Sequence, residues 1–228
     1  WSSDVCSSDL SVELAGVTEH AGMIYVAGGV TSQDRSDLTD RLLRYDPTND
    51  TWTQLTSMNN RRHSFELVSF KGKLIAYGGV AEYFDPVTNT TVEGDSNLTE
   101  AYDPITDTWS QLPNATRKLS AYSAAVYNDE IVIHGGYTQS GWQGTSNDKT
   151  YGYDPFNNVW NTHATLQTGL YDSTLVRAND TLVYASGDTS PTRFGTWSIQ
   201  YLAENEYNIN PSHRSEEHTS ELQSPCNL

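Results

Sequence analysis

One motif recurs three times along this 228-residue chain at nearly constant spacing. Each copy combines Tyr-Asp-Pro with a tryptophan seven residues after the tyrosine, and the pairs are Tyr45 with Trp52, Tyr102 with Trp109, and Tyr153 with Trp160. An apolar run ending in two glycines precedes each copy, at 24–29, 74–79 and 131–136, and a fourth run at 182–187 keeps one glycine. The runs start 50, 57 and 51 residues apart. This period indicates a stack of repeated supersecondary units.

The residues within each copy predict four short strands. The segment 64–70 is rich in residues that favour β-structure, and Lys71-Gly72-Lys73 turns the chain into a second apolar run at 74–77. Chain reversals are also expected at Gly22 and at Asn128-Asp129. Asp-Pro and the polar residues after it are turn-forming sequences between the third and fourth strands. Because no helical period is sustained anywhere, the sequence predicts an all-β fold.

The recurring residues are expected to be structural. Paired glycines suit backbone that takes positive φ or lies very close to a neighbouring chain. Tryptophan supplies a large apolar ring for packing between repeats. Structural roles are therefore predicted for Gly28, Gly29, Tyr45, Asp46, Trp52, Gly78, Gly79, Tyr102, Asp103, Trp109, Gly135, Gly136, Tyr153, Asp154 and Trp160.

An apolar strand ending in Gly-Gly, followed by Tyr-Asp and then Trp, resembles the kelch repeat, and the resemblance covers residues 22–187. It implies a kelch-type β-propeller: about four four-stranded blades of a larger, truncated ring, with repeat cores near 22–60, 72–116, 129–165 and 180–210. Residues 14–20 are expected to form the first strand of copy one. Residues 198–210 are expected to form the last two strands of copy four, with Tyr201 in the tyrosine position.

The two ends resemble translated sequencing adapter. Translating the adapter sequence GACGTGTGCTCTTCCGATCT gives residues 4–10. Translating its reverse complement gives residues 214–219. We expect 1–10 and 214–228 to be adapter-derived, and 11–213 to be an authentic propeller fragment cut at both ends.

Setting the flanks aside changes the composition. Both cysteines, Cys6 and Cys226, lie in the flanks, so 11–213 has none for a disulfide or a cysteine metal site. The flanks carry a net charge of −4, which leaves −12 of the total −16 on 11–213. Because such an acidic surface repels phosphate backbones, we expect no nucleic-acid partner. The fragment also has no apolar run long enough to cross a bilayer.

The copies differ most in the loop between their second and third strands. Copy two inserts 80–97, copy three carries 137–148, and copy one offers the polar segment 34–37. Insertions in repeat proteins cluster on one face, which is often the binding face. The alternative is a locally packed loop without a partner. Candidate binding residues for a protein partner are Asp34, Arg35, Arg62, Tyr83, Phe84, Trp142 and Gln143.

Arg62 is a candidate for a different reason. With Trp52 and Met58 it resembles the Trp, Met and Arg spacing of the kelch domains of BTB–kelch adaptors, the substrate receptors of cullin ubiquitin ligases. The match is confined to this copy. The alternative is a surface arginine with a salt-bridge partner.

The sequence contains no motif or residue spacing typical of a catalytic or metal-binding site. The histidines are dispersed without metal-ligand spacing, and His134, in an apolar strand, is expected to be a core residue. Galactose-oxidase relatives share the propeller but need a cysteine cross-linked to a tyrosine. No nucleophile elbow or phosphate-binding loop is present. We therefore expect no enzyme activity, no cofactor and no metal in this fragment.

The chain contains five N-glycosylation sequons, so an extracellular location stays one of the hypotheses. In a secreted protein each could carry a glycan, and they begin at Asn49, Asn89, Asn97, Asn114 and Asn179. Three hypotheses follow. The first is a protein-interaction propeller, such as the substrate-recognition part of a BTB–kelch ubiquitin-ligase adaptor or a scaffold. The second is a secreted or cell-surface kelch protein that binds glycans or matrix. The third is part of a carbohydrate-active enzyme whose site lies elsewhere.

Overall fold

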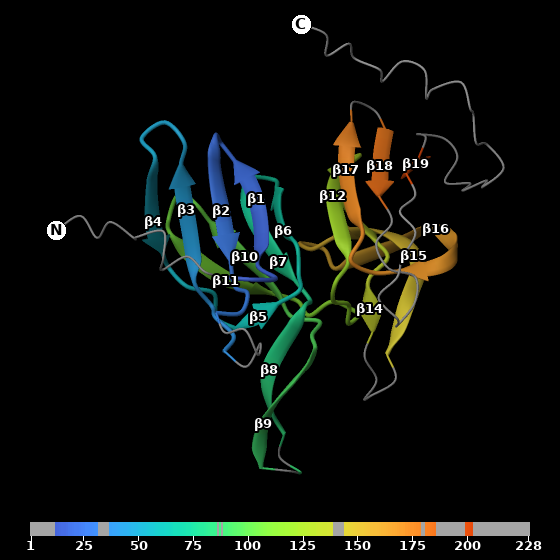
Figure 1. The fold of residues 1–228 in the computed structure, drawn as a ribbon, viewed down its shortest axis with the longest axis horizontal. Coiled ribbons are helices and arrows are strands. Elements are labelled where there is room, and N and C mark those ends of the chain that lie inside the picture. The colour runs from blue at the N-terminus through green and yellow to red at the C-terminus, as the bar shows by residue number, and fades with distance from the viewer. Residues whose placement is uncertain are drawn as a thin grey trace, which may run out of the picture.

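The structure is a computed structural model, and it describes residues 12–31, 37–85, 87, 89–138, 144–178, 181–185 and 199–202. All of its regular elements are strands, and they form a series of antiparallel sheets (Figure 1). The all-β expectation is therefore confirmed. Within the described ranges no helix is long and apolar enough to cross a membrane. The predicted adapter flanks lie outside these ranges.

Each of the first three copies forms one antiparallel blade. Blade one contains β1 (Gly16–His20), β2 (Met23–Ala27), β3 (Leu42–Asp46) and β4 (Thr51–Leu55). Blade two contains β6 (Leu67–Phe70), β7 (Lys73–Tyr77), β10 (Thr99–Asp103) and β11 (Thr108–Leu112). Blade three contains β12 (Ser123–Tyr127), β13 (Glu130–His134), β15 (Thr145–Asp154) and β16 (Val159–Leu170), and β14 (Tyr137–Thr138) pairs with β15.

The fourth sheet has three described strands, β17 (Thr174–Ala178), β18 (Thr181–Ala185) and β19 (Ile199–Leu202). Another three-stranded sheet joins β5 (Arg62–His63), β8 (Val80–Asp85) and β9 (Thr90–Asp95). The insertion of copy two supplies β8 and β9 of this extra sheet, and β5 comes from the segment before blade two. The first strands β1, β6, β12 and β17 contact one another in chain order, which places the sheets side by side around their inner edges (Figure 1).

Tight turns join the first two strands of each blade, as the sequence predicts. In blade two Phe70 pairs with Lys73, and the two turn residues Lys71 and Gly72 both have positive φ. Ala21-Gly22 and Asn128-Asp129 repeat this geometry. Positive φ at both central residues is the requirement of a type I′ hairpin, whose twist matches that of the strands.

The strand register places each motif tyrosine directly opposite its tryptophan. Tyr102 pairs with Trp109 across β10 and β11, and their ring centroids lie 5.2 Å apart. The equivalent separations are 5.0 Å in blade one and 4.2 Å in blade three. The motif aspartate caps the following turn, because Asp103 Oδ1 accepts a hydrogen bond from the Ile105 N–H. The repeated motif therefore sets the register of the outer two strands.

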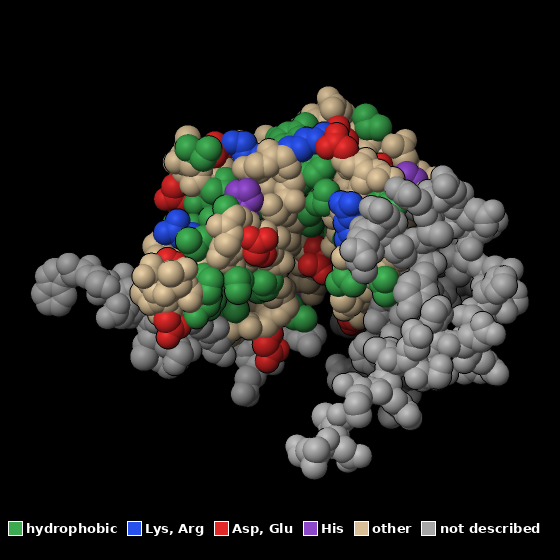
Figure 2. Space-filling view, turned by 90° about the horizontal axis from the view of Figure 1, so that it is seen from above, with side chains coloured by type: hydrophobic (Ala, Val, Ile, Leu, Met, Phe, Trp, Pro, Cys, Tyr) green, Lys and Arg blue, Asp and Glu red, His purple; other side chains and the backbone are tan. Residues whose placement is uncertain are grey.

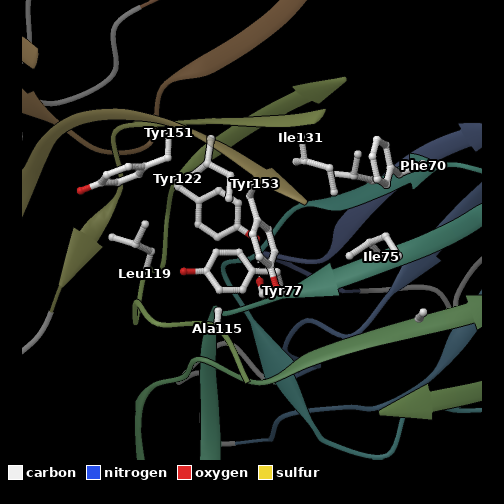
Figure 3. Close-up of a cluster of buried hydrophobic side chains, with 12 residues drawn as sticks. Phe70, Ile75, Tyr77, Ala115, Leu119, Tyr122, Ile131, Tyr151 and Tyr153 are labelled. Atoms are coloured by element: carbon white, nitrogen blue, oxygen red, sulfur yellow. Dashed lines mark hydrogen bonds between the residues drawn. The ribbon is translucent and has the colours of Figure 1, made fainter. Parts of the chain in front are cut away.

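Hydrophobic cores lie between neighbouring blades. Residues of β2 and β3 pack against residues of β6, β7 and β10 in one cluster, and a larger cluster joins blades two and three. Four buried tyrosines dominate the larger cluster, and Figure 3 shows Tyr77, Tyr122, Tyr151 and Tyr153 together. The opposite side of blade one, away from blade two, carries the exposed side chains of Val17 and Ile24.

Candidate functional site

The glycine pairs turn the chain out of each blade on the same side of the molecule. We call this side the loop face, and β8–β9 and the outer ends of β14 and β15 extend from it (Figure 1). Gly78 and Gly79 have positive φ, and a Cβ on either would lie 2.5 Å from a backbone oxygen, of Leu119 or of His63. Both reasons for expecting glycine here, positive φ and close approach, are thus confirmed.

A chain of backbone hydrogen bonds runs along the loop face from blade to blade. The N–H of Ser64 donates to Leu14, that of Ala121 donates to Ser64, and that of Asp172 donates to Ala121, at 2.8 to 2.9 Å. All four residues have φ between 49° and 58°, in the left-handed region. Their spacings of 50, 57 and 51 residues equal those of the glycine runs. Sequence reasoning missed this repeat because its members share no side-chain chemistry.

The residues directly before these four vary in chemistry on an equivalent backbone. Glu13, His63 and Ser120 each pair with the residue that follows a glycine pair, and Tyr171 stands in the same place before Asp172. Glu13 is exposed, whereas His63 and Ser120 are 8% and 4% exposed. The copies therefore present different side chains on an equivalent backbone.

The base of the β8–β9 hairpin joins this row of residues. The Ser120 hydroxyl donates to the carboxylate of Asp95, at the end of β9, over 2.8 Å. On the other side of Ser120, the rings of Tyr137 and Tyr171 lie 5.5 Å apart. Hydroxyl, carboxylate, imidazole and phenol groups thus gather where the insertions leave the blades.

Arg62 is not a surface residue, so the expectation of a surface arginine is wrong. Its side chain is fully buried, donates to the Glu100 carboxylate over 2.5 Å, and also donates to the carbonyls of Gly78 and Leu98. It therefore ties the glycine-pair loop to β10. A salt-bridge partner was expected, but burial was not, because in the other copies this position holds Val12, Leu119 or Leu170.

The β8–β9 hairpin is acidic. Glu82 lies directly opposite Glu93 in the register. Burial, and then the nearby charge of Glu82, raise the pKa of Glu93 above its ordinary value. Tyr83 and Phe84 lie on β8, although the structure does not describe their side chains.

The other candidate binding residues, Asp34, Arg35, Trp142 and Gln143, lie outside the described residues. Whether all the candidates line one rim therefore stays a prediction.

Glu66 is a titratable group that sequence reasoning missed. It lines a cavity of about 10 Å³ between blades two and three, together with Tyr77, Tyr122 and Tyr153. Burial raises its pKa from an ordinary 4.5 to about 7. The sequence does carry a signal, since Glu66 is an acid inside an otherwise apolar stretch, 65–68.

His134 behaves as a core residue, as expected. It is fully buried, its Nδ1 lies 2.9 Å from the Thr150 hydroxyl, and burial lowers its pKa to about 4. The described part of the chain contains no group of three or more His, Cys, Asp or Glu side chains placed to hold a metal ion.

The sequons differ in accessibility. Asn49 and Asn89 are exposed in the turns that follow β3 and β8, and Asn114 is exposed after β11. Asn97 donates its amide to the Ala115 carbonyl, and Thr99 of the same sequon is fully buried. Asn179 lies outside the described residues. Asn97 is therefore a poor glycan acceptor in the folded chain.

Comparison with known proteins identifies the family. Residues 11–142, more than half of the chain, match the model of the Attractin/LZTR1 beta-propeller. The chain belongs to this family. It is a kelch-repeat propeller of the Attractin/LZTR1 type, and the resemblance drawn from the sequence is confirmed.

Relatives of this Attractin/LZTR1-type propeller include kelch-like proteins. Kelch-like protein 36 of Bos taurus is 36% identical over 118 residues, which cover 51% of this chain and 18% of that protein. Kelch repeat and BTB domain-containing protein 12 of Danio rerio is 28% identical over 168 residues, covering 69% and 26%. The matched part is therefore only a fraction of each relative's length.

A solved structure confirms the fold of the Attractin/LZTR1-type propeller. The structure of YjhT superposes with a TM-score of 0.67 at 15% sequence identity, covering 84% of this chain and 65% of that one. At this identity the likeness concerns the fold alone.

Proposed function

We propose that this chain is a protein-interaction propeller whose loop face binds a segment of a protein partner. The observation that carries the proposal is the concentration of variable features on one face: the β8–β9 hairpin, the β14–β15 extension and the row Glu13, His63 and Ser120. A backbone geometry repeated in each blade supports these features, while their side chains differ from blade to blade. Loops that vary on a rigid scaffold are where binding residues concentrate.

The opposite face supports this choice of side. Figure 2 shows that face with Lys and Arg interspersed with Asp and Glu, and with apolar side chains in small groups. Its connections are mainly short turns such as 21–22, 71–72 and 128–129. Short turns offer little room for specific recognition, in contrast to the insertions of the loop face.

Within a longer protein, we propose that the propeller recognises the partner while other domains determine its fate. The kelch-like relatives, one of which carries a BTB domain in its name, support such a division of labour. In a ubiquitin-ligase adaptor the bound segment would belong to the substrate. The aromatic candidates Tyr83, Phe84 and Trp142 would supply anchoring contacts, because aromatic residues dominate binding energy at interfaces.

The test is a triple substitution of Tyr83, Phe84 and Trp142 by alanine in the full chain, used as bait for partner capture. Captured protein should fall several-fold while near-ultraviolet circular dichroism stays unchanged. The matched control is Ile105→Ala with Phe156→Ala, two exposed apolar residues in the turns of the opposite face. Loss of capture with the control variant, and not with the triple variant, would move the binding site to the opposite face.

A further inference from the structure

The β8–β9 hairpin leaves one strand edge open. In its sheet β8 lies between β5 and β9, and among the described residues β9 pairs with β8 alone. Figure 1 shows the hairpin standing clear of the blades. An edge strand presents a row of unpaired backbone N–H and C=O groups, which are a template for another strand.

The β9 edge lacks most of the features that usually block strand addition. The six pairs from Val80–Asp95 to Asp85–Thr90 follow one another without a bulge. β9 contains no proline and no lysine, and its first residues, Thr90, Thr91 and Val92, are β-branched. Thr90 and Thr91 are exposed. Natural sheets protect such edges with bulges, proline or charged side chains, especially lysine. Of these, β9 carries an exposed acid, Glu93, and among the described residues no further strand covers the edge.

The charges of the hairpin select the chemistry of that strand. Glu82 and Glu93 face each other directly, and like charges at such positions destabilise a sheet. Among the described residues no lysine or arginine forms an ion pair with either carboxylate. A cation supplied from outside the hairpin would relieve this repulsion. Asp95, at the end of β9, is buried and accepts the Ser120 hydrogen bond, so the charge argument rests on Glu82 and Glu93.

We propose that β9 binds a basic, extended segment of a protein partner as an additional strand, with lysine or arginine side chains of that segment beside Glu82 and Glu93. The inference deepens the proposed function, on which it rests, by naming the element that binds and the kind of segment it fits. Strand addition of this type takes affinity from main-chain hydrogen bonds and specificity from alternate side chains. A second copy of this chain fits poorly, because two β9 edges would bring acidic strands together.

The probe is a short fluorescein-labelled peptide in which lysine alternates with threonine, titrated with the full chain and followed by fluorescence anisotropy. A peptide with glutamate in place of lysine is the charge control. Two further peptides carry N-methyl groups on alternate residues, one on the lysines and the other on the threonines. Only every second residue of a bound strand donates its N–H to the edge, so one of these two peptides should bind and the other should not.

The protein variant Glu82→Lys/Glu93→Lys keeps two like charges opposite each other but reverses their sign. It should bind the lysine peptide about tenfold more weakly, a loss of about 1.4 kcal/mol. Glu82→Lys alone creates an attractive cross-strand pair, so it keeps the hairpin folded and should still weaken binding. The control Glu19→Lys/Asp129→Lys makes the same change in net charge away from the hairpin and should bind as the unaltered chain does.

Equal binding of both N-methylated peptides would overturn the proposal, because attraction would then need no strand pairing. Equal binding by the hairpin variant and its control would overturn it as well. The two proposals fail separately. If capture of partners falls in the Tyr83, Phe84 and Trp142 variant while the lysine peptide does not bind, the proposed function holds and strand addition at β9 is wrong. If capture is unchanged in that variant, the proposed function is wrong whatever the peptide does.

Discussion

The Arg62 guanidinium on β5 donates a hydrogen bond to the Glu100 carboxylate on β10 of blade two, and both side chains are fully buried. The remaining Glu100 oxygen accepts a hydrogen bond from the Asn59 N–H at 3.0 Å. In blade three the equivalent positions hold Leu119 and Tyr151, which belong to an apolar cluster. One ion pair therefore occupies a place that the next blade fills with an apolar pair.

Replacing one member of this pair should be far more damaging than replacing both. Arg62→Leu leaves the Glu100 carboxylate buried without its cation, which should cost about 3–5 kcal/mol of unfolding free energy. The double variant Arg62→Leu/Glu100→Leu removes both charges and should recover most of that loss. Urea denaturation of the two variants and the unaltered chain measures the difference. Equal losses in the single and double variants would contradict a coupled buried pair.

Comparing Gly78 with Gly72 distinguishes two reasons why a position requires glycine: positive φ and lack of space for a Cβ. Both have positive φ, but a Cβ on Gly78 would lie 2.5 Å from the Leu119 oxygen, whereas a Cβ on Gly72 would have no atom within 4 Å. Gly72→Ala should therefore cost about 1–2 kcal/mol, the left-handed penalty alone. Gly78→Ala should cost clearly more, because the glycine loop must also move away from the neighbouring chain. Thermal unfolding of both variants checks this, and equal shifts would contradict the steric argument.

The sequence predicted the parts of the fold that rest on repeated side-chain chemistry. Tyr102 and Trp109 recur in three copies because each blade closes its outer strands with the same ring pair. Residues such as Ser64 and Ala121 were not predicted, because what they repeat is a backbone conformation and a backbone hydrogen bond. A left-handed residue need not be glycine when the inter-blade hydrogen bonds hold it in place.

The site was predicted less completely than the fold, again for physical reasons. Arg62 occurs in one repeat only, so the sequence favoured a surface position for it. Its partner Glu100 is 38 residues away in the chain. The available signal was a glutamate two residues before the motif tyrosine, where the other copies carry the buried Leu43 and Tyr151. The position of the insertions was predictable from the different lengths of the repeats between their second and third strands. The cross-strand pairing of Glu82 with Glu93 needed the register.

Glu66 should make stability depend on pH around neutrality. Burial raises its pKa from 4.5 to about 7, so the folded chain favours the protonated acid. Its contribution to stability is therefore complete below pH 4.5, falls as pH rises towards 7, and levels off above that. The total change should be about 3 kcal/mol, most of it between pH 5 and pH 8. Urea denaturation at pH 5 and pH 8 compares the unaltered chain with Glu66→Gln.

Glu66→Gln isolates this effect from the other titrating groups. The variant should lose little stability from pH 5 to pH 8 beyond what those groups cause, so the two stability curves should diverge as pH rises. His134 acts in the opposite direction. Because burial lowers its pKa from 6.5 to about 4, its contribution is present above pH 6.5 and lost as pH falls. Parallel curves for the unaltered chain and Glu66→Gln would show that Glu66 is well solvated.

Trp109 and Trp52 offer a matched test of packing between blades. Trp109 packs against the cluster between blades one and two, and its indole N–H donates to the Thr56 carbonyl at 2.8 Å. Trp52 has the same place in blade one, where the described contact is with the ring of Tyr45 in its own blade. Both side chains are half-buried.

Trp109→Ala should therefore cost about 2–4 kcal/mol, and Trp52→Ala clearly less, because only the first substitution removes contacts between blades. Trp109→Phe keeps an aromatic ring but loses the hydrogen bond to Thr56, and it should cost about 1 kcal/mol of its own. Urea denaturation followed by far-ultraviolet circular dichroism measures all three variants on one scale. If Trp52→Ala proves as costly as Trp109→Ala, the ring pair within each blade, and not the contact between blades, is what the tryptophan stabilises.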